Sequence, residues 1–377
     1  MNLKNAAKAL LVMAMLAFAL AACGGDDRKE GEETQGGAKP TSAAPAPGQA
    51  DAGKKLTIFI WSEYIDPEVI SDFEKTHNVR VKLDLYESNE EMISALQTGR
   101  QGAYDIIVPT TYFLPSLINL GLIQPIRKEL LPNLGNLDPS FTEIEEDPGN
   151  KFNVPYQWGT SGMAIRAKPG QTYENSWDLL FKPSLDKGNF IIFDTARDAL
   201  GAALMYLGYS SNTIDPAQVK EAGDLLIQAK NQPTFMSFNG GVDGLSNVMG
   251  GVASIAQVYS GESVKASLED PEVKYVIPKE GCEIWMDVFA IPTGAANVEV
   301  AHEFLNYILE PEIAARLATY SKYGTPNAKA MSLIPTEDRD NPGIYPPQDL
   351  RANMQYYKDL GNDGRLFEET WTFVKSR

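Results

Sequence analysis

Hydrophobic residues from position 55 onward recur with the periods of alternating strands and helices. Residues 56–60 form a short apolar run typical of a buried strand, and an Asp-Pro pair begins a predicted helix over 66–77. Apolar and polar residues alternate over 79–85, which predicts a second strand. A helix over 89–99 and a third apolar strand over 104–108 follow. This order predicts a parallel sheet with helical crossovers.

A second α/β series begins near Gly162. Its predicted elements are a strand over 190–193, a helix after Asp194, a helix beginning at Asp215, and strands over 273–278 and 287–291. Roughly 320 residues follow position 54, which is more than one hydrophobic core of ordinary size holds. Two α/β domains are therefore expected.

The first 22 residues have the pattern of an export signal, with two lysines, an apolar run over 9–20 and two alanines directly before Cys23. The apolar run is shorter than the roughly 20 residues that a membrane-spanning helix needs. Residues 20–23 resemble the bacterial lipobox, so Cys23 is predicted to carry the lipid anchor after cleavage. Ordinary secretory cleavage after Ala22 is the alternative.

The segment 23–54 is predicted to be a lipid-anchored disordered linker, because it is rich in Gly, Pro, Ala and charged residues and lacks aromatic residues. The two cysteines are Cys23 and Cys282. A lipidated Cys23 has no free thiol, so we expect Cys282 to be a lone buried thiol and not half of a disulfide. The expected location is the periplasm or the outer face of the cell membrane.

The chain has a formal net charge of −17, which makes nucleic acid an unfavourable partner. An acidic surface favours the approach of cations, but salt screens this effect within about 8 Å. A plain role in solubility explains the acidity equally well.

Ligand sites of open α/β sheets lie beyond the carboxyl ends of the strands. Aromatic, hydroxyl and acidic residues gather at these predicted positions, which hold Trp61, Ser62, Glu63, Tyr64, Thr110, Tyr112, Asp198, Trp285 and Asp287. A buried unpaired ammonium costs several kcal/mol, and one aromatic face returns only about 0.5 to 2 kcal/mol. Carboxylates that pair the N–H groups add roughly 1.5 to 3 kcal/mol each. The set therefore predicts a site for a small organic cation. The alternative is that the tryptophans are core and the acids cap helices, and for Asp198 capping explains the position equally well.

Six blocks of sequence, in order, resemble the bacterial spermidine/putrescine-binding proteins of ABC importers. They are FIWSEY at 59–64, YESNE at 86–90, GAYDIIVPTTY at 102–112, VPYQWG at 154–159, WMDVFAIP at 285–292 and GTPN at 324–327. The resemblance implies a class II periplasmic-binding-protein fold, in which two α/β lobes joined by crossing strands close over a polyamine. Lobe 1 would comprise 55–160 and 285–331, and lobe 2 would comprise 161–284 and 332–377.

The resemblance also implies roles for individual residues. The aromatic box would consist of Trp61, Tyr64, Tyr112, Tyr259, Trp285 and Tyr323. Asp198 and Asp287 would pair the amines, with Ser62, Glu63 and Thr110 as polar contacts. The hinge would lie near 156–160, near 283–286 and after Met331.

Several positions depart from the family pattern. Thr195 stands where the spermidine-type pattern has a second acid, and Asp198 stands where a glutamate is usual. A late glutamine of the pattern aligns loosely with Tyr356 or Tyr357. Spermidine and putrescine therefore both remain open as ligands.

An enzyme is not expected, because the two histidines, His77 and His302, lie on predicted helices and no nucleophile, phosphate-loop or metal-ligand motif is present. Neither a cofactor nor a metal is expected. A quaternary-ammonium binder of the betaine type, a polyamine sensor domain and a secreted hydrolase are the alternatives. The resemblance implies ABC permease membrane subunits as partners, and a monomer is expected.

Overall fold

The computed structural model describes residues 53–167, 170, 172–182 and 188–377. The predictions for the export signal, for Cys23 and for most of the linker lie outside the described residues.

The N-terminal part of the sheet has the predicted order. Its elements are β1 (Lys54–Trp61), α1 (Pro67–His77), β2 (Val79–Tyr86), α2 (Asn89–Ala95) and β3 (Ile106–Ile107). β1 pairs in parallel with both β2 and β3. The Asp66 side chain accepts a hydrogen bond from the Glu68 backbone N–H at the start of α1, so this predicted cap is confirmed.

Two details of this part differ from prediction. The third strand is two residues long and not five, since only Ile106 and Ile107 pair with β1 in strand register. The second helix is α-helical only to Ala95 and continues as a π-helical turn over Leu96–Arg100, where Gly99 has φ of 91°.

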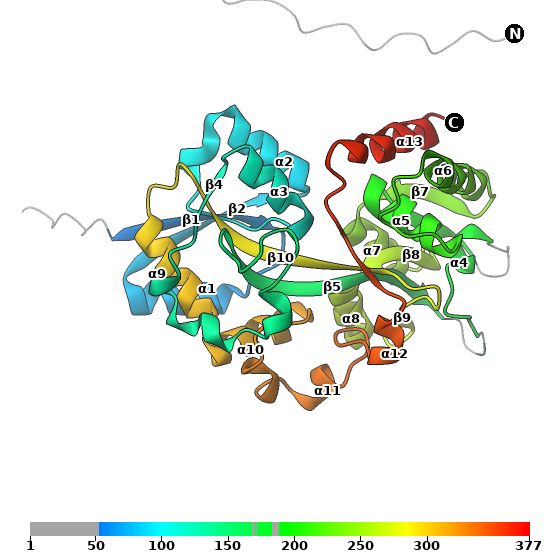
Figure 1. Ribbon diagram of the computed structural model, residues 1–377. Coiled ribbons are helices and arrows are strands. Elements are labelled where there is room, and N and C mark those ends of the chain that lie inside the picture. The colour runs from blue at the N-terminus through cyan, green and yellow to red at the C-terminus, as the bar shows by residue number, and fades with distance from the viewer. Residues whose placement is uncertain (1–52, 168–169, 171, 183–187) are drawn as a thin grey trace, which may run out of the picture. The chain divides into compact units, whose positions relative to one another are not determined.

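Two long strands, β5 (Asn153–Arg166) and β10 (Glu283–Pro292), run antiparallel through the middle of the sheet. The sheet order is β2-β1-β3-β10-β5-β8-β6-β7, so the predicted parallel sheet is a mixed one. Figure 1 shows β5 and β10 side by side, connecting one group of helices to the other. The register places Trp285 opposite Gly159 and Asp287 opposite Gln157.

The second α/β series surrounds the far ends of these strands. Its elements are α4 (Asp178–Phe181), β6 (Phe190–Phe193), α5 (Ala196–Tyr206), α6 (Pro216–Lys230), β7 (Phe235–Asn239), α7 (Gly241–Met249), β8 (Ile255–Tyr259), α8 (Ser260–Glu269), β9 (Val273–Val276) and, at the end of the chain, α13 (Gly364–Ser376). β6 is parallel to β7 and β8, whereas β8 and β9 pair antiparallel with β5. The helix starts predicted after Asp194 and at Asp215 are confirmed.

The remaining elements are short or lie outside the sheet. They are α3 (Leu114–Asn119), β4 (Ile123–Gln124), α9 (Val298–Ile308), α10 (Pro311–Ser321), α11 (Thr336–Arg339), α12 (Gln348–Arg351), β11 (Gln355–Tyr356) and 3-10 turns at Gln101–Ala103, Thr111–Phe113, Lys128–Leu130, Pro132–Asn136, Pro139–Phe141, Ala330–Ser332 and Gly361–Asp363.

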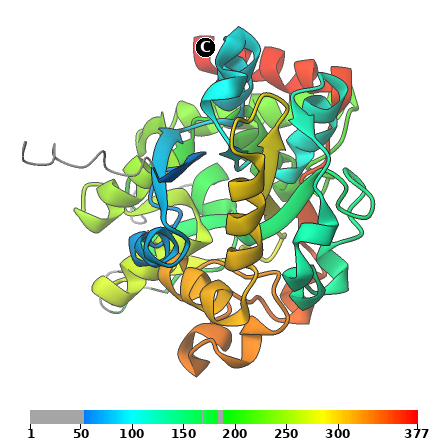
Figure 2. The ribbon, with the colours of Figure 1, turned by 90° about the vertical axis from the view of Figure 1, so that its left-hand side faces the viewer.

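Alternate residues of β1 pack on opposite faces of the sheet. Leu56, Ile58 and Ile60 belong to one buried cluster with side chains of α1 and α9, whereas Phe59 belongs to another with side chains of α2 and α3. Figures 1 and 2 show these helices around the N-terminal strands. A separate cluster lies between β6, α5, α6 and α13, and it includes Cys282, a free buried thiol as predicted. Helices therefore pack on the strands of both α/β parts.

None of the described helices is both long enough and apolar enough to cross a membrane.

Candidate functional site

Asp287 lies where β10 passes the carboxyl end of β3. An isolated antiparallel bridge joins its backbone to Thr110, and Thr110 is held in turn by Asn89. The Asn89 amide nitrogen donates to Thr110 Oγ1 at 3.1 Å, and the Thr110 N–H donates to Asn89 Oδ1 at 3.1 Å. The register of β10 with its neighbours thus fixes the position of the Asp287 carboxyl.

The Asp287 side chain is 5% exposed, and its Oδ1 atom has no hydrogen-bond partner among the described residues. Burial raises the pKa of this carboxyl from 3.8 to about 7, although the neighbouring Thr110 and Tyr64 hydroxyls lower it. A positively charged donor would satisfy the unpaired Oδ1 atom and would also compensate for the burial of the carboxylate charge. The carboxyl is thus ready to pair with an ammonium group.

Asp198 is the second buried acid of the site, and it lies in the first turn of α5. Thr195 is the helix cap, since its side chain accepts a hydrogen bond from the Asp198 N–H. The Asp198 carboxylate accepts hydrogen bonds from Ser161 Oγ at 3.1 Å, Thr195 Oγ1 at 2.5 Å, Tyr357 Oη at 2.7 Å and Tyr259 Oη at 3.4 Å. Four hydroxyls therefore stabilise this carboxylate.

Aromatic rings connect the two acids. Tyr64 contacts Tyr323 with ring centroids 5.7 Å apart, and Tyr323 contacts Trp285 at 4.8 Å. Trp285 in turn contacts Tyr259 at 5.9 Å, and all three contacts are edge-to-face. Tyr112 packs against Tyr357 at 5.3 Å. Four of the six predicted box residues thus form one row of rings, and a fifth, Tyr112, pairs with Tyr357. The two groups meet at Asp198, which accepts hydrogen bonds from Tyr259 and Tyr357.

Gly159 makes room for this arrangement. A Cβ atom at this position would lie 2.5 Å from Trp285 Cζ2 and 2.8 Å from Tyr323 Cδ1. The two rings therefore approach the backbone of β5 directly, which a residue with a side chain would prevent.

The remaining predicted residues lie at the edge of this cluster. The Trp61 indole N–H donates to the Val108 carbonyl at 2.9 Å, and its ring contacts Tyr86 at 4.5 Å. Ser62 and Glu63 form an exposed turn after β1, where Glu63 has φ of 52°. None of the hydrogen bonds of the two acids comes from Ser62. Burial raises the pKa of the Glu262 carboxyl, and the nearby Glu63 carboxylate raises it further.

Four residues of the site were not predicted from the sequence, or only loosely. Ser161 and Tyr357 donate to Asp198, and the Tyr323 hydroxyl donates to Glu262. Gln157 shares the sheet face of Asp287, is 1% exposed and has neither amide atom paired among the described residues. Ser161 and Gln157 lie on β5, which is buried on both faces, so no alternation of apolar and polar residues identifies them.

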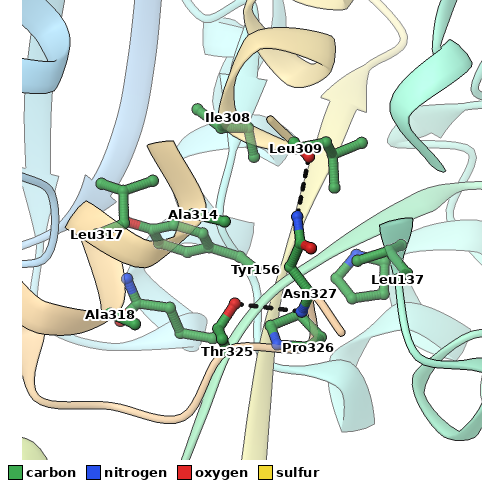
Figure 3. Close-up of a pocket in the computed structure, with 12 residues that line it drawn as sticks. Leu137, Tyr156, Ile308, Leu309, Ala314, Leu317, Ala318, Thr325, Pro326 and Asn327 are labelled. Atoms are coloured by element: carbon green, nitrogen blue, oxygen red, sulfur yellow. Dashed lines mark hydrogen bonds between the residues drawn. The ribbon is translucent and has the colours of Figure 1, made fainter. Parts of the chain in front are cut away.

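Two hollows among the described residues have neither Asp198 nor Asp287 in their lining. The first is a cavity of about 10 Å³, which has room for about one water molecule. Figure 3 shows the residues that line it. It is lined by Leu137, Pro155, Tyr156, Gln157, Ile308, Leu309, Ala314, Leu317, Ala318, Thr325, Pro326 and Asn327. A larger hollow of about 560 Å³ includes none of the predicted site residues. It is lined by Phe59, Lys82, Asp84, Leu85, Glu91, Ser94, Ala95, Thr98, Arg100 and Tyr104. The predicted site itself is closely packed, with Trp285 7% and Asp198 6% exposed.

No cluster of three His, Cys, Asp or Glu side chains within the described ranges could hold a metal ion.

Comparison with known proteins identifies the family. The family model for bacterial extracellular solute-binding proteins matches residues 68–342. The chain belongs to this family. The solute-binding protein is 34% identical over 329 residues to the spermidine/putrescine-binding periplasmic protein of Escherichia coli, covering 87% of this chain and 93% of the relative. It is also 34% identical to the putrescine-binding periplasmic protein SpuD of Pseudomonas aeruginosa, covering 87% of this chain and 94% of that one.

Solved structures confirm the predicted periplasmic-binding-protein fold. A putative spermidine/putrescine ABC transporter from Listeria monocytogenes superposes with a TM-score of 0.78 at 35% identity, covering 85% of this chain and 99% of the other. A substrate-binding protein from Streptococcus pneumoniae gives a TM-score of 0.75 at 29% identity, covering 86% and 99%. Family membership also confirms the expectation that this solute-binding protein is not an enzyme.

Proposed function

We propose that this solute-binding protein captures a polyamine outside the cytoplasm and delivers it to the membrane subunits of an ABC importer. The observation that carries the proposal is the pair of buried acids, Asp287 and Asp198, within one aromatic cluster. The names of the relatives, which include spermidine/putrescine-binding and putrescine-binding proteins, support the same ligand class.

The chemistry of the site fits a linear chain of methylenes between amines. Each ammonium needs a carboxylate, because desolvation of an unpaired charge costs several kcal/mol. The rings of Trp285, Tyr259 and Tyr323 offer apolar faces for the methylenes and cation–π attraction for the amines. Asp287 Oδ1, which lacks a partner among the described residues, is the acceptor that the first amine would meet.

Binding would proceed by closure of two lobes joined by β5 and β10. Trp61, Tyr64 and Tyr112 come from the N-terminal α/β part, whereas Asp198 and Tyr259 come from the second series. Trp285 and Asp287 lie on the connecting strand between them. A ligand that touches both groups stabilises the closed state over the open one, because only the closed state makes both sets of contacts.

The lipid anchor at Cys23 belongs to the same proposal. The sequence over 20–23 supports acylation, and the Gly- and Pro-rich segment that follows would give the binding domain reach at the membrane surface. An anchored, monomeric binding protein would keep its loaded site close to the permease.

Calorimetric titration of the purified protein with putrescine, cadaverine, spermidine, spermine, agmatine and betaine tests the function. We expect at least one polyamine to bind and betaine not to bind. A quaternary nitrogen has no N–H to donate, so tight betaine binding without polyamine binding would refute the assignment.

A further inference from the structure

Glu283, the first residue of β10, is a buried acid that the proposed mechanism does not use. Side chains alternate along a strand, so Glu283, Trp285 and Asp287 project from the same face of β10. The facing strand β5 contributes Gln157, Gly159 and Ser161 to that same face, as the pairing of Trp285 with Gly159 requires. Glu283 therefore continues the line of site residues beyond Trp285.

The Glu283 carboxyl is fully buried, yet neither of its oxygens has a hydrogen-bond partner among the described residues. Helix α5 leaves space for it, because Gly201 lies one turn after Asp198 and a Cβ atom there would overlap Glu283 Oε1. Asp198 and Gly201 thus lie on the same face of α5, and the missing side chain of Gly201 leaves the space that the Glu283 side chain of β10 occupies. The Glu283 carboxyl therefore lies against α5 one helical turn after Asp198.

The charged and titratable groups around Glu283 come from several elements. They are Asp198 and Arg197 on α5, Cys282 on the preceding position, Tyr275 on β9 and Tyr357 after β11. Burial and then Asp198 raise the pKa of Glu283 well above its usual range, and Arg197 offsets this only in part. The Arg197 Nη atoms donate to the Lys358 carbonyl and to Asn212 Oδ1 and not to Glu283. Among the described residues, no cation pairs with this acid.

We propose that Glu283 and Asp198 together form a two-carboxyl subsite for the far ammonium group of a triamine. The inference rests on the proposed function and adds a residue that determines ligand length. Asp287 lies four residues further along β10, which is roughly 14 Å of strand. A triamine exceeds a diamine by an aminopropyl arm, so only the longer ligand reaches from Asp287 past Trp285 to Glu283.

Tyr357 covers the subsite, since its hydroxyl donates to Asp198 at 2.7 Å and lies within electrostatic reach of Glu283. The arriving ammonium takes the place of this hydroxyl and donates to both carboxyls. The ammonium then balances the buried negative charge that burial and Asp198 disfavour in the ligand-free protein.

Calorimetry of the whole protein with spermidine and putrescine tests the inference. Glu283→Gln keeps the shape of the side chain, and Glu312→Gln on the exposed start of α10 is the charge-matched control. We expect Glu283→Gln to lower spermidine affinity about tenfold or more and putrescine affinity less than about threefold, while the control changes neither.

A second variant, Gly201→Ala, displaces the Glu283 carboxyl without removing it and should give the same selective loss of spermidine affinity. Equal changes for both ligands, or no change for either, would overturn the role of Glu283 while the proposed function stands. If the unmodified protein binds neither polyamine, the proposed function fails and the inference fails with it.

Discussion

The substitution Asp287→Asn removes a carboxylate whose negative charge is disfavoured by burial in the ligand-free protein. The same charge is needed to pair with a bound ammonium group. The folded carboxyl has a pKa of about 7 against an ordinary value of 3.8. Because the folded pKa is the higher one, the folded chain holds more protons than the unfolded chain between about pH 4 and pH 7. The contribution of Asp287 to stability is therefore present in acid and is lost as the pH rises through 7.

The size of this loss follows from the two pKa values. Their difference corresponds to about 4 kcal/mol of unfolding free energy by pH 8, an upper figure for a carboxyl that is 5% exposed. Asparagine does not titrate, so the variant should gain stability over the natural protein as the pH rises from 5 to 8. In polyamine binding, the variant loses charge-assisted hydrogen bonds of roughly 1.5 to 3 kcal/mol, which lowers affinity about 10- to 150-fold.

Urea unfolding at pH 5 and pH 8 measures the first effect, and calorimetry with putrescine measures the second. Asp349→Asn, on the exposed start of α12, is the control and should change neither quantity by more than about 0.5 kcal/mol. A stability difference between Asp287→Asn and the natural protein that is the same at both pH values would refute the burial argument. Unchanged putrescine affinity would refute the role of Asp287 as an amine partner.

Four further predictions address the rest of the account. Asp198→Asn should weaken polyamine binding by roughly 1.5 to 3 kcal/mol in calorimetry, and an unchanged affinity would exclude it from the site. Trp285→Leu should cost about 0.5 to 2 kcal/mol of binding through the lost aromatic face, and a gain in affinity would contradict the proposed cation–π contact. X-ray scattering should show a smaller radius of gyration on adding saturating polyamine, whereas equal radii would argue against lobe closure. Cys23→Ser should release the protein from the membrane fraction of cells, and a variant that stays membrane-bound and fully processed would disprove the lipid anchor.

The part of the fold that was predicted correctly consists of elements with local signals. The Asp66 and Asp215 caps lie next to the helices that they begin, and the apolar strand over Phe190–Phe193 is bounded by polar residues. The long strand β5 gives no such signal, because it is buried along almost its whole length and contains Pro155, Gly159 and Gly162. Its partner β10 lies more than 100 residues further along the chain, so no local pattern indicates the pairing, and only the family resemblance pointed to crossing strands near 156–160 and 283–286.

The candidate site divides in the same way. Asp198 and Asp287 could be found because each follows or lies within a recognisable element. Ser161, Tyr357 and Glu283 could not be assigned, because their roles depend on contacts that cross the sheet and on the space left by Gly201. Burial also cannot be inferred for Glu283 from its neighbours in sequence, where an acid at a strand end is ordinarily exposed.

A crystal structure of the protein with spermidine or putrescine tests the central claim most directly. The account predicts ammonium nitrogens within hydrogen-bond distance of the Asp287 and Asp198 carboxylates, with methylenes lying against the Trp285 ring. A polyamine bound elsewhere, with the four hydroxyl contacts of Asp198 intact and Asp287 Oδ1 still unpaired, would contradict it.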